Sequence, residues 1–129
     1  MPSNITIDNK KDTVTITLHG MRKIAAMKSS VTFGISHITS VGKAGHDVEK
    51  RFSTIADMNH LRIMGTAVSN HYYGGTFMNM NAHPHEKEFW DVDDPEECIV
   101  ITLDHEPFTR IYISTDDADK TIRRLQSII

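Results

Sequence analysis

The segment CIVITLDHEPFTRIYISTDDADKTIRRLQSII, residues 98–129, decides the class of fold. Its first six residues, Cys98–Leu103, are apolar at nearly every position, which predicts the most buried strand of a sheet. Asp104–Pro107 then predicts a hairpin into a second strand, Arg110–Ser114. The remaining residues predict an amphipathic helix with Asp116 as its N-cap. The apolar stripe of this helix, at helical spacing, consists of Ala118, Ile122, Leu125 and Ile129.

Alternation of apolar and polar residues predicts further strands upstream. It is clearest over Thr13–Leu18, where every second residue is apolar. The other predicted strands lie around Ile5 and Ile7, over Val31–Ile35, Ile38–Val41, Arg62–Thr66, Tyr72–Met78 and Glu88–Val92. Met21–Lys28 is rich in residues that favour helix and predicts a short extra helix near residues 21–28. Several short strands followed by one helix predict a mainly β barrel or sandwich closed by that helix.

Length and composition predict one soluble globular domain spanning residues 1–129. The chain has 129 residues, of which 39% are hydrophobic and 24% charged, as in ordinary globular proteins. A formal net charge of -3 argues against a nucleic-acid-binding protein, which would normally be basic. It also provides no general attraction to an anionic membrane.

The expected location is the cytoplasm. The single cysteine, Cys98, is unable to form an intramolecular disulfide, and the N-terminus lacks the pattern of a signal peptide. The longest apolar runs are too short to span a bilayer, so no integral membrane association is expected.

Several segments, in order along the chain, resemble a group of short bacterial proteins with a pleckstrin-homology-like (PH-like) fold. The matching segments are Met21–Lys28, Arg62–Thr66, Gly75–Phe77, Phe89–Val92, Pro95-Glu96 with Ile99–Ile101, and Tyr112–Asp117. The resemblance implies a barrel of about seven antiparallel strands in two crossed sheets, capped by the C-terminal helix. It carries no catalytic residue across to this chain.

One short cluster has the side chains of a metal site. His83, His85 and Glu86 lie in a predicted loop, with Asp91 a few residues further on, and imidazoles with carboxylates are suitable ligands for zinc or nickel. This pattern is the basis of an alternative function, a metal-binding protein or a metal-dependent hydrolase. Only half of the usual paired spacing is present, so an exposed polar loop is the favoured interpretation. Whether the eight histidines bind metal or sense pH is left open.

Two other groups of residues are candidate contacts with a partner. Arg22, Lys23 and Lys28 would form a basic patch for an anionic lipid headgroup, a third functional hypothesis, although surface charges of this kind usually serve only solvation. Trp90 would anchor a partner if it were exposed. Alternation along a strand places Phe89 and Trp90 on opposite faces, so at least one of them is expected in the core.

The sequence favours a non-enzymatic binding or interaction module without a cofactor. Cys98 is interpreted as a core residue, and Gly74-Gly75 as a point of backbone freedom in a turn or bulge. An enzyme would require His71, Asp91 and Cys98 to meet in space. The expected partner is a protein or a peptide, with a second copy of the chain as a further candidate. The resemblance to PH-like proteins implies that such a partner adds as a strand at an open sheet edge or in the groove beside the terminal helix.

Overall fold

The computed structural model describes residues 4–18, 30–44, 60–68, 72–79 and 86–129. Within these ranges the chain forms nine strands, two short 3-10 helices and one α-helix. The strands are β1 (Asn4–Asp8), β2 (Thr13–Thr17), β3 (Ser30–Gly34), β4 (Ile38–Lys43), β5 (His60–Val68), β6 (Tyr72–Asn79), β7 (Glu86–Val92), β8 (Cys98–Leu103) and β9 (Arg110–Ser114). The helices are η1 (Ile35–His37), η2 (Pro95–Glu97) and α3 (Ala118–Gln126).

The strands form two sheets, with orders β1-β2-β3 and β4-β8-β9-β7-β6-β5. The mainly β class and the C-terminal helix are therefore confirmed. The described strands number nine instead of about seven, and no strand pairing among them closes the two sheets into a barrel. The expected antiparallel order has one exception, because β7 lies parallel to β9. The helix predicted near residues 21–28 lies outside the described residues.

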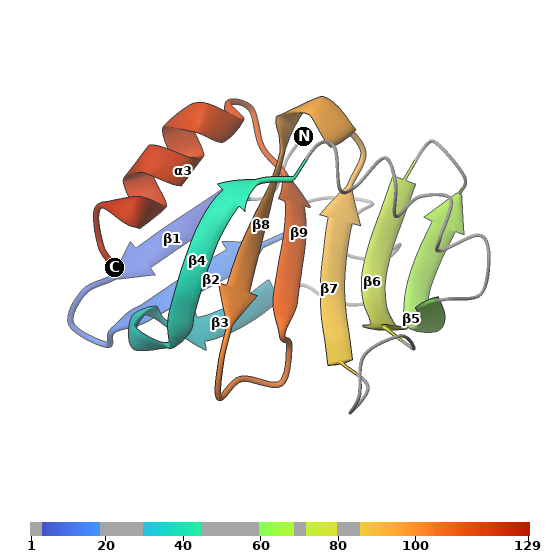
Figure 1. Ribbon diagram of the computed structural model, residues 1–129, viewed down its shortest axis with the longest axis horizontal. Helices are drawn as coiled ribbons and strands as arrows, with labels where there is room; N and C mark the ends of the chain where they lie inside the picture. Colours follow the sequence, from blue (N-terminus) through green and yellow to red (C-terminus); the bar gives the residue numbers. More distant parts are fainter. Residues whose placement is uncertain (1–3, 19–29, 45–59, 69–71, 80–85) are drawn as a thin grey trace.

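The three-stranded sheet lies behind part of the larger sheet and crosses its strands (Figure 1). One hydrophobic core fills the space between the sheets and reaches α3 through Ala118 and Leu125. Its buried side chains from the larger sheet come from β4, β8, β9 and β7, ending at Phe89. No described residue of β6 belongs to this core. Three strands thus cover only part of a six-stranded face.

The opposite face of the larger sheet carries a second buried cluster. Trp90 stacks on Tyr112 with ring centroids 4.3 Å apart, and Phe77 packs edge-on against Trp90 at 6.2 Å. Both faces of β7 are therefore buried, and the two carboxylates of Glu88 and Asp91 are fully buried with them. Strand β8 (Cys98–Leu103), which the sequence predicts to be the most buried strand, is matched in burial by β7. β7 lies inside the sheet and is buried at every residue from Glu88 to Val92 but not at Glu86 and Lys87, and β8 is buried at four of its six residues and partly exposed at the other two.

Helix α3 begins one residue later than predicted. Asp117, not Asp116, is the N-cap, and its carboxylate accepts a hydrogen bond of 3.1 Å from the backbone N–H of Lys120. Leu125 of the predicted stripe is fully buried, but Ile129 is 53% exposed. The helix ends at Gln126, so Ile128 packs against the core in place of Ile129.

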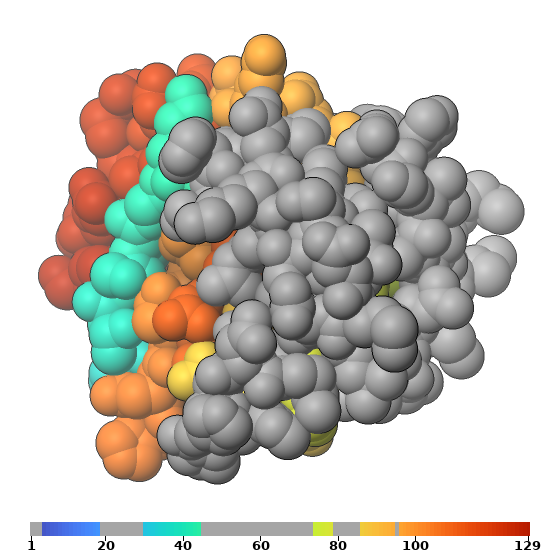
Figure 2. All heavy atoms as spheres, turned by 45° about the vertical axis from the view of Figure 1, so that its right-hand side comes forward, coloured from blue at the N-terminus to red at the C-terminus, as the bar shows by residue number. Residues whose placement is uncertain are grey.

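Helix α3 also covers the β4 edge of the larger sheet. Figure 2 shows the atoms of α3 directly against those of β4, and the two elements are in contact over much of their length. The side-chain amide of Gln126 donates a hydrogen bond of 3.1 Å to the backbone carbonyl of Val41. A carbonyl at this edge is thereby satisfied within the chain.

Candidate functional site

Strand β3 forms an edge of the three-stranded sheet. The N–H of Ile35 donates to the carbonyl of Asp12, beyond the end of β2, at 2.9 Å. Because backbone groups alternate in direction along an antiparallel strand, Val31 and Phe33 also bond toward β2. The backbone N–H and C=O groups of Thr32 and Gly34, which alternate with these residues, therefore point away from β2 to the outer side of the sheet.

The contacts of Thr32 and Gly34 agree with this alternation. The Thr32 and Thr15 hydroxyls lie 2.9 Å apart, and close side chains are typical of a pair that exchanges no backbone hydrogen bonds. The outward N–H of Gly34 donates to Oε2 of Glu106 at 3.2 Å. Within the described part of the chain, no strand and no side chain bonds the outward N–H and C=O of Thr32. An edge of this kind is a template for another strand.

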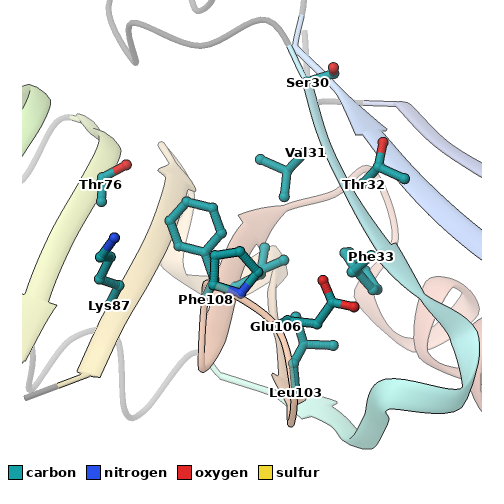
Figure 3. A pocket seen from close by; sticks show the side chains of 11 residues that line it. Ser30, Val31, Thr32, Phe33, Thr76, Lys87, Leu103, Glu106 and Phe108 are labelled. Atoms are coloured by element: carbon teal, nitrogen blue, oxygen red, sulfur yellow. The ribbon is translucent and has the colours of Figure 1, made fainter. Parts of the chain in front are cut away.

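A groove of about 410 Å³ lies directly beside this edge. In Figure 3 the residues of β3 form one wall, Thr76 and Lys87 lie on the facing wall, and Phe108 and Glu106 lie between them. The groove is open here because the core between the two sheets ends at β7. We call it the β3 groove, and its lining residues are Ser30, Val31, Thr32, Phe33, Thr76, Lys87, Leu103, Glu106, Pro107, Phe108 and Ile111.

The lining of the β3 groove combines an apolar floor with a few polar groups. Phe108 packs edge-on against Phe89 with ring centroids 5.7 Å apart, which extends the core into the groove. Lys87 and Glu106 provide one charge of each sign. Pockets that bind ligands usually have such a lining and enclose about 300–1,000 Å³. At 410 Å³ the β3 groove has room for a few side chains.

Glu106 joins the β8–β9 hairpin to the end of β3. Its Oε2 contacts Nδ1 of His37 as well as the N–H of Gly34. The carboxylate is largely buried, with a side-chain exposure of 14%. The N–H of Asp104 donates to the carbonyl of His37 at 3.0 Å, and the ring of His105 lies 5.9 Å from that of His37. These contacts hold the hairpin against one end of the open edge.

The metal-ligand set predicted from the sequence does not assemble among the described residues. Glu86 and Asp91 lie five residues apart on β7, which puts them on opposite faces and about 17 Å apart along the strand. Glu86 pairs instead with Arg110, at 3.1 Å. His83 and His85 lie outside the described residues. No group of three or more histidine, cysteine or acidic side chains in the described ranges is placed to hold a metal ion.

Trp90 is not exposed, so the role of an exposed anchor is corrected to that of a core residue. The side chain is fully buried, and its Nε1 donates to Oε1 of Glu88 at 3.2 Å. It faces away from the three-stranded sheet, toward Phe77 and Tyr112, because every second residue of β7 points that way. The other candidate contacts, Arg22, Lys23 and Lys28, lie outside the described residues, as does His71.

Cys98 has the structural role expected from the sequence, whereas Gly74 and Gly75 lie inside β6 and not in a turn. Cys98 is fully buried, and burial raises the pKa of its thiol well above the ordinary value, with nearby Asp94 adding to the rise. This environment suppresses the thiolate that a nucleophile requires. Of the two glycines only Gly75 has a positive φ, 122°, which requires backbone freedom, and it lies opposite Trp90 in the pairing of β6 with β7.

The sequence analysis missed the β3 groove. The alternation around Val31 and Phe33 predicts a strand, but it does not indicate that the strand lies at an edge. Lys87, Glu106 and Phe108 come from β7 and the β8–β9 hairpin, and no spacing in the sequence relates them to β3. Only the order of strands in the two sheets brings these residues together.

Comparisons of the chain with protein-family models, with curated proteins and with solved structures found no match. No helix in the described ranges is long and apolar enough to cross a bilayer.

Proposed function

We propose that this protein is a non-enzymatic binding module that takes an extended peptide segment of a partner protein as a fourth strand of the three-stranded sheet. The observation that carries the proposal is the outward N–H and C=O of Thr32, which have no partner within the described ranges and lie beside an apolar groove. Backbone groups at a sheet edge supply affinity for another backbone, and neighbouring pockets supply specificity.

The shape of the β3 groove favours an extended segment over a bulkier partner. A strand added to β3 would continue the smaller sheet across the larger one, toward Thr76 and Lys87 on the facing wall (Figure 3). Strands in one sheet lie about 4.8 Å apart, so the new strand would lie next to the floor formed by Phe108. A helix, with a diameter of about 10 Å, makes poor use of a single row of backbone groups.

The resemblance to PH-like proteins implies two places for strand addition, an open sheet edge and the groove beside the terminal helix, and the proposal takes the first. None of the residues that line the β3 groove belongs to α3. We therefore retain strand addition from that resemblance and assign it to the β3 edge. The edge beside α3 is β4, where the helix already covers the strand.

The test is a pair of substitutions at Thr32, assayed with peptides selected for binding to the full chain from a random seven-residue display library. Thr32→Pro removes the outward N–H but no hydrogen bond between β2 and β3, so the edge strand tolerates it. Thr32→Val keeps the N–H and the side-chain shape. We expect Thr32→Pro to weaken binding by about tenfold or more, because a backbone hydrogen bond is lost, and Thr32→Val to weaken it by less than about threefold.

Thermal unfolding of both variants serves as the control for folding. Equal affinity of the Thr32→Pro and Thr32→Val variants, with both folded, would contradict strand addition at β3. Selection of no peptide at all by the folded wild-type chain would contradict the proposed function itself.

A further inference from the structure

The usable length of the β3 edge is limited at one end by Glu106. Oε2 of this residue accepts the outward N–H of Gly34 at 3.2 Å and is held there by its contact with His37. The outward groups of Thr32 lie two residues before this cap, in the middle of β3. An added strand therefore centres its hydrogen bonds on Thr32.

The pairing with Thr32 determines which side chains of the added strand enter the groove. Residues directly opposite each other in a sheet have side chains on the same face. Thr32 is exposed, next to the hydroxyl of Thr15, so the residue opposite it faces solvent. The two neighbours of that residue share the face of Val31 and Phe33, which are 5% and 2% exposed. They enter the groove beside Phe108, where apolar side chains are favoured.

Charge distinguishes the two ends of the added strand. Glu106 lies at the Gly34 end of β3 through its hydrogen bond to that residue. In an antiparallel pair, which is slightly more stable than a parallel one, the N-terminal flank of the added strand lies at this same end. A basic residue there is complementary to the carboxylate of Glu106, whose side chain retains an exposure of 14%. Lys87 lies on the facing wall (Figure 3).

We propose that the partner segment adds antiparallel to β3 and carries, in order, a basic residue, an apolar residue, a small polar residue and a second apolar residue. The small polar residue lies opposite Thr32 and exchanges both backbone hydrogen bonds with it. The basic residue lies near Glu106, and the two apolar residues occupy the β3 groove. This proposal rests on the proposed function and names the partner that the groove selects.

The main test compares two fluorescein-labelled peptides of identical composition by fluorescence anisotropy with the full chain. The first, Gly-Lys-Val-Thr-Val-Ser-Gly, has the proposed order. The second, Gly-Val-Lys-Thr-Ser-Val-Gly, moves both valines by one position, away from the residue opposite Thr32. We expect the second peptide to bind about tenfold or more weakly, because burial of one such side chain is worth about a tenfold change in affinity or more.

N-methylation of the first peptide tests the register and the direction. In the antiparallel register the N–H of its central threonine donates to Thr32, whereas the N–H of the following valine points away from β3. Methylation of the threonine nitrogen is expected to abolish binding, and methylation of that valine nitrogen to preserve it. The reverse result would overturn the antiparallel register.

A third peptide tests whether the basic residue lies near Glu106. The peptide Gly-Ser-Val-Thr-Val-Lys-Gly moves the lysine to the other flank, and we expect it to bind about threefold more weakly than the first peptide at low salt. Screening at about 1 M salt reduces this difference, and the Glu106→Gln variant removes it. A preference that persists in Glu106→Gln would overturn the assignment to Glu106.

The Thr32→Pro variant separates failure of this inference from failure of the proposed function. Loss of binding in Thr32→Pro together with equal affinities for the first two peptides would overturn the sequence pattern and leave strand addition in place. Tight binding of the first peptide to Thr32→Pro would overturn both. The expected result is that the first peptide binds best and that Thr32→Pro loses this binding.

Discussion

Two sheet edges of this molecule, β4 and β3, differ in what lies beside them. The β4 edge is covered by α3, and the Gln126 amide satisfies the carbonyl of Val41. Among the described residues the β3 edge has one cap, from Glu106 to Gly34, and beyond it lies the β3 groove. Proteins commonly protect edges by covering them. The β3 edge, open as far as the described part of the chain extends, is therefore the feature that most requires a functional explanation.

The largest expected effect concerns the side chain that holds α3 in place. Leu125 is fully buried in the core shared by both sheets, so Leu125→Ala is expected to lower the free energy of unfolding by about 2–5 kcal/mol. Denaturation in urea measures this loss. The matched control is Ile129→Ala, because Ile129 is 53% exposed and is expected to change little. Equal effects of the two substitutions would mean that α3 does not dock through Leu125.

A smaller effect is expected at the cap of the β3 edge. Glu106→Ala removes the acceptor for the Gly34 N–H and the partner of His37, which should cost about 1–3 kcal/mol of stability because partly buried polar groups lose their bonds. Asp104→Ala is the control, since the Asp104 side chain is 52% exposed. Chemical denaturation of both variants provides the comparison. An effect of Asp104→Ala as large as that of Glu106→Ala would contradict the capping role of Glu106.

The smallest of these effects is expected at the cap of the β4 edge. Gln126→Ala leaves the Val41 carbonyl without the side-chain donor, at a cost of about 0.5–1.5 kcal/mol. Denaturation in urea gives the unfolding midpoint and m value of Gln126→Ala and of a control, Arg124→Ala, whose exposed side chain lies on the same helix. The difference in the free energy of unfolding between the two variants measures this hydrogen bond. If Gln126→Ala were no less stable than Arg124→Ala, the β4 edge would be covered by packing alone.

Sequence patterns predicted the parts of the fold that depend on local residues. The bounds of β8 and β9 agree with the predicted Cys98–Leu103 and Arg110–Ser114, because each is an apolar or alternating run between turn residues. The N-cap was displaced by one residue because Asp116 and Asp117 both suit that position, and only the entry of the chain into α3 selects Asp117.

The features that the sequence did not predict depend on distant parts of the chain. The parallel pairing of β7 with β9 and the burial of Glu88 follow from the position of β7 inside the larger sheet. The candidate site has the same origin. Its edge exists because β3 is the last of the described strands in the smaller sheet, and its groove exists because the larger sheet extends beyond the smaller one. Alternation along a strand carries no information about its neighbours in space.

Amide hydrogen exchange along β3 tests the open edge most directly, because it needs no ligand. The N–H groups of Val31 and Phe33 point toward β2, and that of Thr32 points outward. We expect strong protection at Val31 and Phe33 and nearly free exchange at Thr32, since only unbonded, accessible amides exchange without opening of the structure. Protection of Thr32 equal to that of Phe33 in the isolated protein would contradict the account, because the edge would then already be occupied.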